Sequence, residues 1–267
     1  MAEIGQIKQL MKIMWTSGDF GKIAQFMERS AEEFVRGLQL KPGMHVLDVG
    51  CGTGNQSIPA ARAGAKVRGV DIASNLLAQA AERATHERLN IEFKEGDAEA
   101  LPFQDQEFDV VTSMFAAMFA PRPEMVVSEF VRVCKPGGLI AMGNWTAGSF
   151  VARQNAVASR FVPPPPDAAN PMDWGDERVV KQRFGERADV VCTRRPFVFD
   201  LPFGPEQAEE YFSRHLGPMQ IVLSRLDESG KEQLLEERKQ FWVRENQGDA
   251  NHTIIRTEYL EVHARPN

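Results

Sequence analysis

The chain has 267 residues, of which 43% are hydrophobic and 25% are charged. This composition is typical of a globular protein, and the length allows one α/β domain with an elaboration. A formal net charge of −6 gives no general attraction to phosphate backbones, so we expect no nucleic-acid partner. The three cysteines, Cys51, Cys134 and Cys192, are widely spaced and odd in number, which predicts neither a disulfide framework nor a metal site.

The first residues predict a helix rather than a targeting signal. Ile4, Ile7, Leu10, Met11 and Met14 share one helical face, and no cleavage pattern follows them. No apolar run in the chain approaches the ~20 residues that span a bilayer. We therefore expect a cytoplasmic protein with no membrane partner, while the sequence leaves its oligomeric state open.

Short apolar runs then alternate with helical patterns up to about residue 145. Repeated β–α units predict a mostly parallel sheet with helices on both faces. Ligands of such sheets bind at the edge where the strands end, near the switch in strand order. We expect strands at 46–49, 67–71, 91–93, 108–111 and 139–142, and helices at 22–38, near 57–63, after Ser74 and around 125–133.

The second half of the chain has a different pattern. Residues 163–175 are rich in proline and glycine and predict a loop. A helix at 177–184, strands at 190–199 and 253–264, and a helical stretch between those strands follow. We therefore expect one Rossmann-like domain made of residues 41–200 and 251–267, with residues 201–250 as a helical insertion before the last strand.

The strongest signal lies where the first strand ends. Asp48 is followed by Gly50, Gly52 and Gly54, and such glycines let a backbone take positive φ and approach a ligand closely. A dinucleotide-binding turn has the spacing G-x-G-x-x-G. Asn55 and Ser57 stand where its third glycine is required, which disfavours a nicotinamide-dependent oxidoreductase.

This motif resembles motif I of the class I S-adenosylmethionine-dependent methyltransferases, and the core is similar to the quinone-biosynthesis group. The family has a seven-stranded Rossmann-like sheet and binds S-adenosyl-L-methionine. The resemblance implies that Asp71 bonds the ribose hydroxyls, that Ile72 packs on the adenine, and that Asp97 and the Ala98 amide meet its edge. The donor-binding residues implied in this way are Asp48, Gly50, Cys51, Gly52, Gly54, Asp71, Ile72, Asp97, Ala98 and Ser113.

The acceptor site is less well defined. In similar enzymes the N-terminal segment covers the donor, so residues 1–40 are a predicted lid, and residues 201–250 are a predicted cap. The expected acceptor-pocket residues are Trp15, Phe20, Met114, Met118 and Trp174. Packing in the core is the alternative for Met114 and Met118, and a plain packing role is the alternative for Trp15 and Phe20.

The resemblance implies direct in-line transfer of a methyl group to a small, partly apolar metabolite. Such a reaction needs positioning and no covalent intermediate, so we assign no catalytic residue. Tyr211 and His215 lie four residues apart on an expected helix and are candidate general bases, with a solvated surface as the alternative for His215. A non-catalytic S-adenosylmethionine sensor or scaffold, and the oxidoreductase, remain as other functions.

Overall fold

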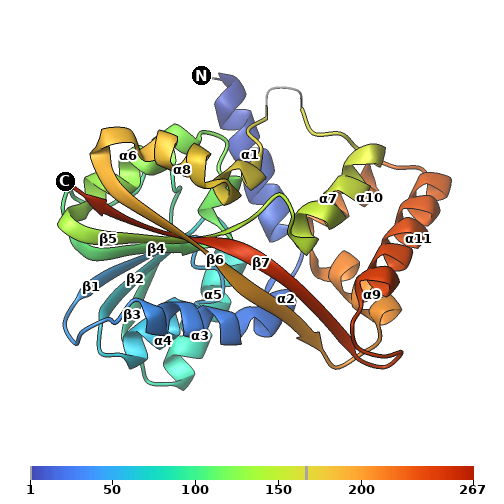
Figure 1. Ribbon diagram of the computed structural model, residues 1–267, viewed down its shortest axis with the longest axis horizontal. Coiled ribbons are helices and arrows are strands. Elements are labelled where there is room, and N and C mark those ends of the chain that lie inside the picture. The colour runs from blue at the N-terminus through green and yellow to red at the C-terminus, as the bar shows by residue number, and fades with distance from the viewer. Residues whose placement is uncertain (1, 166–167) are drawn as a thin grey trace.

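The computed structural model describes residues 2–165 and 168–267, so that Met1 of the predicted lid and Pro166 and Asp167 of the predicted loop lie outside the described residues. A seven-stranded sheet forms the centre, with the strand order β3-β2-β1-β4-β5-β7-β6 (Figure 1). The strands are β1 (His45–Val49), β2 (Lys66–Asp71), β3 (Ile91–Glu95), β4 (Phe108–Met114), β5 (Cys134–Trp145), β6 (Ala188–Leu201) and β7 (Thr253–Pro266).

Five strands run parallel, and β7 pairs antiparallel with both β5 and β6. The central strands β1 and β4 are almost wholly buried, as expected where helices cover both faces of a parallel sheet. The chain steps outward from β1 to β3 and then returns to β4 on the other side of β1, so the loops after β1 and β4 meet at the switch in strand order. The predicted Rossmann-like fold class is confirmed.

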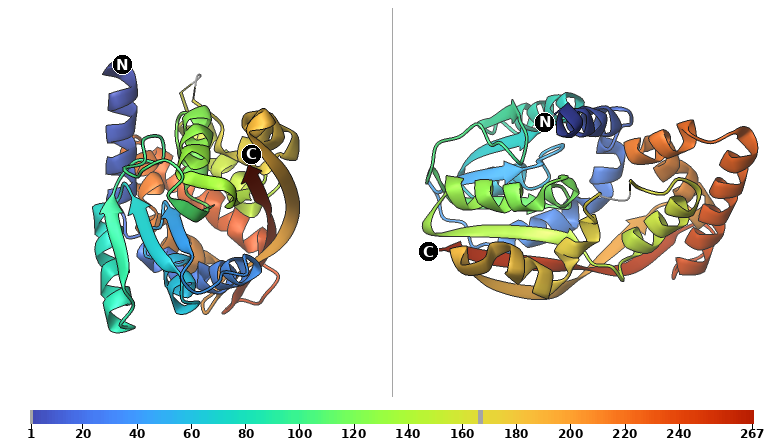
Figure 2. Two further views of the ribbon diagram at one scale, coloured as in Figure 1. Left: turned by 90° about the vertical axis from the view of Figure 1, so that its left-hand side faces the viewer. Right: turned by 90° about the horizontal axis from the view of Figure 1, so that it is seen from above.

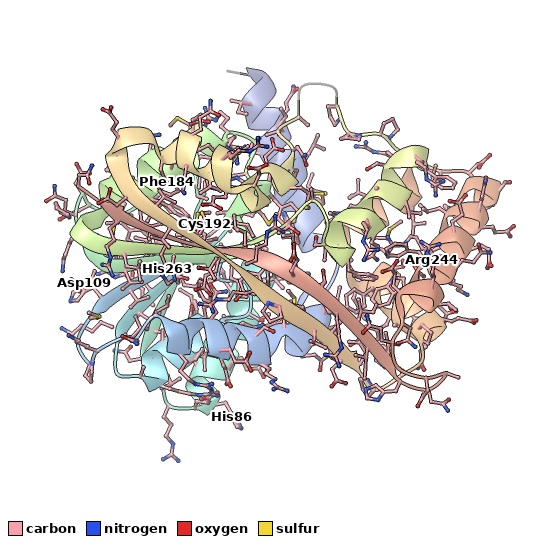
Figure 3. All side chains as sticks on the ribbon, viewed as in Figure 1. His86, Asp109, Phe184, Cys192, Arg244 and His263 are labelled. Carbon is pink, nitrogen blue, oxygen red and sulfur yellow. The ribbon has the colours of Figure 1, made fainter. Side chains whose placement is uncertain are left out.

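Helices cover both faces of the sheet. In Figure 1, α6 and α8 lie above it and α3 and α4 lie below it, and Figure 3 shows Phe184 of α8 directed into the interior. Within the described residues, no helix is both long enough and apolar enough to cross a membrane. The α-helices of this part are α1 (Ala2–Thr16), α2 (Gly21–Ala24), α3 (Glu28–Gly37), α4 (Ser57–Arg62), α5 (Ser74–His86), α6 (Pro123–Val133) and α8 (Glu177–Phe184).

The single helix expected at 22–38 is interrupted. A short 3-10 turn at Gln25–Met27 separates α2 from α3. The Asn55 side-chain amide donates to the Ala24 carbonyl at 2.8 Å, so that carbonyl has a tertiary partner at the point where the α-helix stops. This hydrogen bond links the N-terminal segment to the loop after β1.

A second group of helices packs against the far parts of the long strands β6 and β7, at the right of Figure 1, and the top view in Figure 2 shows it beside the main body. Sequence reasoning assigned no helix to residues 150–161, yet they form α7, capped by the Ser149 hydroxyl. The helices of this group are α7 (Phe150–Phe161), α9 (Pro205–His215), α10 (Gly217–Ser224) and α11 (Glu228–Glu245). The last three form the insertion expected between β6 and β7.

Candidate functional site

One cavity joins most of the residues singled out by the sequence. It lies where β1, β2 and β4 end, and α1 forms part of its wall. Among the predicted donor-binding residues, Gly50, Cys51, Gly52, Asp71, Ile72, Asp97 and Ala98 line it, whereas Asp48, Gly54 and Ser113 do not.

The glycine-rich loop is shaped by positive backbone angles. The φ angles of Gly50, Gly52 and Gly54 are 70°, 52° and 84°, a region that side chains with a Cβ rarely adopt. A Cβ at Gly50 would lie 2.2 Å from the Ala116 Cβ, whereas one at Gly52 would meet no atom within 4 Å. Gly50 therefore permits packing against the segment after β4, and Gly52 leaves open space toward the cavity.

Asp71 stabilises this loop from the end of β2. Its Oδ2 accepts a hydrogen bond from the Gly52 amide, and its Oδ1 accepts one from the Ala73 amide, both at 2.8 Å. Burial raises the pKa of Asp71, while these backbone bonds oppose the rise. Each carboxylate oxygen can accept more than one hydrogen bond, so Asp71 can also accept from a ligand in the cavity.

Asp48 lies behind the loop and is wholly buried. Its Oδ2 accepts a hydrogen bond from the Ser57 hydroxyl at 2.6 Å, but its Oδ1 is buried without a partner. Burial raises the pKa of Asp48 to about 7, the Ser57 bond opposes this rise, and the nearby Asp71 adds to it. A buried carboxylate oxygen without a partner costs free energy, and a cation placed beside it would remove that cost.

A lysine on α1 pairs with the acidic residues that follow β3. The Lys8 ammonium lies 2.5 Å from Asp97 Oδ2 and 2.7 Å from Glu99 Oε2. The Glu99 side chain is fully buried and also pairs with Arg122 at 2.7 Å. These contacts hold α1 against the loop after β3 and place Lys8 in the cavity wall.

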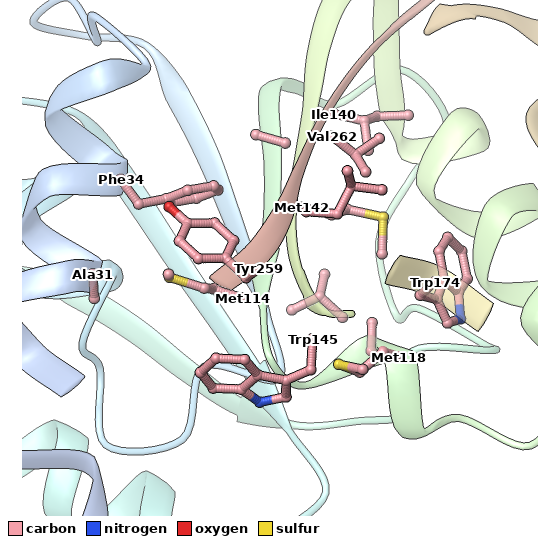
Figure 4. Packing of buried hydrophobic residues seen from close by; sticks show 14 of the residues in the cluster. Ala31, Phe34, Met114, Met118, Ile140, Met142, Trp145, Trp174, Tyr259 and Val262 are labelled. Atoms are coloured by element: carbon pink, nitrogen blue, oxygen red, sulfur yellow. The ribbon is translucent and has the colours of Figure 1, made fainter. Parts of the chain in front are cut away.

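The predicted acceptor residues separate into two groups. Trp15, Phe20 and Met114 line the cavity, whereas Met118 and Trp174 do not and are only 2% and 1% exposed. Figure 4 shows Met114 near Tyr259, and Met118 near Trp174. The Trp174 ring also stacks against the Arg183 guanidinium, 4.6 Å from the ring centroid, so it belongs to the packing of the loop and α8.

Tyr211 and His215 lie away from the cavity lining. The Tyr211 hydroxyl donates to the Lys22 carbonyl at 3.3 Å and accepts from the Gln25 side chain at 3.1 Å. The His215 carbonyl accepts from the Asp19 amide at 3.0 Å. The insertion thus contacts the segment that follows α1, and none of residues 201–250 contributes to the cavity wall.

Sequence reasoning missed several lining residues, most clearly Lys8, Met11 and Met27. On α1, the apolar face expected to be buried is partly exposed, because Ile7 and Leu10 are 40% and 57% exposed. The cavity instead faces Lys8, Met11 and Trp15. The spacing of Lys8, Met11 and Trp15, about one helical turn apart, could have indicated this face. The more apolar face beside it was chosen instead, because apolar periodicity is the usual indicator of a buried helix face.

The chain matches the family model described as "Methyltransferase domain" over residues 47–142. It is 36% identical over 214 residues to an uncharacterized protein of Mycobacterium tuberculosis, covering 78% of this chain and 77% of the relative. It is also 36% identical over 178 residues to a phosphatidylethanolamine N-methyltransferase of Cereibacter sphaeroides, covering 64% of this chain and 81% of the relative.

Solved structures have the same fold at low sequence identity. The YcgJ protein of Bacillus subtilis aligns with a TM-score of 0.62 and 15% identity, over 90% of this chain and 98% of its own. Phosphoethanolamine N-methyltransferase 2 of Haemonchus contortus, in complex with S-adenosyl-L-methionine, aligns with a TM-score of 0.53 and 22% identity, over 90% of this chain and 53% of its own.

The chain therefore belongs to the class I S-adenosylmethionine-dependent methyltransferases, and not to the nicotinamide-dependent oxidoreductases. Its cofactor is S-adenosyl-L-methionine. The similarity to the quinone-biosynthesis group stays a prediction.

Proposed function

We propose that this enzyme transfers the methyl group of S-adenosyl-L-methionine to a small, partly apolar acceptor by direct in-line displacement. One observation carries the proposal. A single cavity joins the loops after β1, β2 and β3 to the apolar side chains of α1 and of the segment after β4. The first part suits a nucleoside and an amino acid, and the second part suits an apolar acceptor.

The residues of the loops fit the donor. Asp71 has the spare acceptor capacity that two ribose hydroxyls require. Asp48 Oδ1, buried without a partner, would accept a hydrogen bond from the ammonium group of the methionine moiety, directly or through water. Asp97 and the Ala98 amide border the same cavity and are matched to the edge of adenine.

The bound cofactor supplies a methyl group on a positively charged sulfur. The task of the protein is then to hold an acceptor atom ~3 Å from that methyl carbon and to exclude water, which can supply much of the rate gain. Trp15 and Phe20 of the N-terminal segment border the cavity and are proposed as parts of its lid. We propose that residues 201–250 act on this lid by contact, since α9 holds the backbone at Asp19 and Lys22.

The Cereibacter sphaeroides relative is named for an acceptor that joins a polar head to apolar chains, which supports a partly apolar acceptor here. The test is calorimetric titration with S-adenosylhomocysteine, followed by methyl transfer from labelled S-adenosylmethionine to pools of small amines, phenols and lipids. We expect micromolar binding and labelled product. Absence of binding would refute the proposal, and binding without transfer to any pool would favour a sensor or scaffold.

A further inference from the structure

The acceptor end of the cavity is lined by aromatic rings. Phe115 and Phe119 follow β4, and Trp15 and Phe20 come from the N-terminal segment. The Trp15 ring lies 5.7 Å from that of Phe20 and 5.5 Å from that of Phe119, both in edge-to-face arrangements. Rings packed in this way stay in fixed orientations, because each edge rests on a neighbouring face.

The polar part of the lining lies on the donor side. Asp97 is paired with Lys8, Asp71 accepts from two backbone amides, and Asn55 bonds Ala24 and Arg83. Within the described residues, the polar or charged side chains of the lining, apart from the Cys51 thiol and the Trp15 indole N–H, are Lys8, Thr53, Asn55, Gln56, Asp71 and Asp97. All six come from α1 or from the loops after β1, β2 and β3, so the aromatic end presents aromatic rings and methyl groups, with the Trp15 indole N–H as its polar side-chain group.

Phe115, in this wall, has a strained backbone conformation. Its φ angle is 58°, which is a true outlier for a bulky residue and costs on the order of 1–3 kcal/mol. The Phe115 amide donates to the Gly143 carbonyl at 2.7 Å, and its ring stacks on Trp145 with centroids 3.8 Å apart and planes 4° from parallel. The ring also meets Phe197 and Tyr259 edge to face, so packing against β5, β6 and β7 maintains the strained conformation of a residue that lines the cavity.

From this wall we infer that the acceptor is an uncharged amine on an apolar framework, and that Phe115 and Phe119 select it by stabilising the positive charge that it acquires. The inference rests on the proposed function and goes beyond it by naming the acceptor class. The nitrogen lone pair forms the new bond to the methyl carbon, and the electrons of the sulfur–methyl bond remain on sulfur. One positive charge therefore passes from sulfur to nitrogen, and no proton has to leave for the bond to form.

Other acceptors fit the wall less well. An oxyanion would lose its hydration among rings whose faces carry negative charge and attract cations. Methylation of a carbon–carbon double bond would also leave a cation that aromatic faces stabilise, but this carbocation must lose a proton to a base, and no ionisable side chain of the described lining lies at the aromatic end. An ammonium that forms against aromatic faces needs no base and is stabilised where water is excluded.

The experiment compares a cation with its uncharged counterpart of the same shape. The probes are 3-(trimethylammonio)phenol and 3-tert-butylphenol, titrated by calorimetry into the S-adenosylhomocysteine complex, in which the donor carries no sulfonium charge. We expect the cation to bind about tenfold more tightly, which is the size of a desolvated cation–π interaction. We expect Phe115→Leu and Phe119→Leu each to reduce this ratio at least threefold and to leave S-adenosylhomocysteine affinity within about twofold.

Phe26→Leu is the matched control, because Phe26 packs on Phe203 and Tyr211 outside the cavity. We expect it to keep the full ratio. Equal or tighter binding of the uncharged probe, no binding of either probe, or a cation preference that survives both substitutions at the cavity would overturn the inference. If the unmodified protein did not bind S-adenosylhomocysteine, the proposed function itself would be refuted.

Discussion

Gly52 offers a way to separate the donor site from the stability of the fold. It and Gly54 both have positive φ, at 52° and 84°. A Cβ at Gly54 would make ordinary contacts of 3.5 Å with Ala80 and Ile58, whereas a Cβ at Gly52 would meet nothing within 4 Å. Of these two glycines, only Gly52 lines the cavity. Alanine at either position therefore strains the backbone similarly, but only Gly52→Ala places a methyl group in the donor's space.

The two effects have different sizes. A non-glycine residue in the left-handed region costs roughly 1–2 kcal/mol, so each variant should lower Tm by about 2–8 °C for a chain of this size. Overfilling a packed site costs about 1–3 kcal/mol. Gly52→Ala should thus weaken S-adenosylhomocysteine binding roughly 5- to 150-fold, whereas Gly54→Ala should leave it within about twofold.

Thermal unfolding of the two ligand-free variants measures the decrease in Tm, and calorimetric titration measures the decrease in S-adenosylhomocysteine affinity. Similar losses of Tm together with a selective loss of binding in Gly52→Ala would support the assignment of the loop. Equal affinities in both variants, or a larger loss of affinity in Gly54→Ala, would show that the donor does not approach Gly52.

Three further predictions concern charged groups. Burial raises the pKa of Asp48 from 3.8 to about 7, so the contribution of Asp48 to the stability of the ligand-free protein should fall as the pH rises from about 4 to 7. Binding of the ligand ammonium needs the ionised carboxylate, so affinity should increase about tenfold per pH unit up to pH 7 and then level off. Calorimetric titration across this pH range should show no such slope for Asp48→Asn. Arg238→Met leaves Glu209, its fully buried partner at 2.6 Å, without a counter-charge, so chemical denaturation should reveal a loss of about 3–5 kcal/mol that a second substitution, Glu209→Leu, largely restores. Lys8→Met removes the contacts of α1 with the part-exposed Asp97 and the buried Glu99, but Glu99 keeps its pair with Arg122. Because a part-exposed ion pair contributes up to about 1 kcal/mol, hydrogen exchange should accelerate up to about fivefold in α1 while the strands stay protected.

Much of the proposed donor site could be predicted from local sequence. Gly50, Asp71 and Asp97 follow strands that a parallel sheet aligns at one edge, so strand patterns and glycine spacing were enough to bring them together. Asp48 was also expected beside the loop, but its burial and its unpaired Oδ1 depend on packing by α4. The backbone positions were therefore predictable, and the electrostatic environment was not.

The acceptor side shows the limit of that reasoning. Met114 ends β4 and Met118 follows it in the same apolar stretch, yet Met114 lines the cavity and Met118 is buried away from it. A left-handed turn at Phe115 and a 3-10 turn at Ala117–Phe119 separate them, and neither has a local sequence signal. Trp15 faces the cavity because Lys8 and Lys12 of α1 pair with acidic residues around β3.

The succession of strands and helices along the chain, the glycine-rich loop and the three strand-end acids were thus determined by the sequence alone, because they follow from periodicity and spacing within short stretches of chain. The side of α1 that faces inward, the aromatic wall around Phe115 and the contact of the insertion with the N-terminal segment were decided by tertiary structure. Each of these depends on surfaces that lie far apart in the sequence, and their burial and pairing energies outweigh the local preferences of the chain.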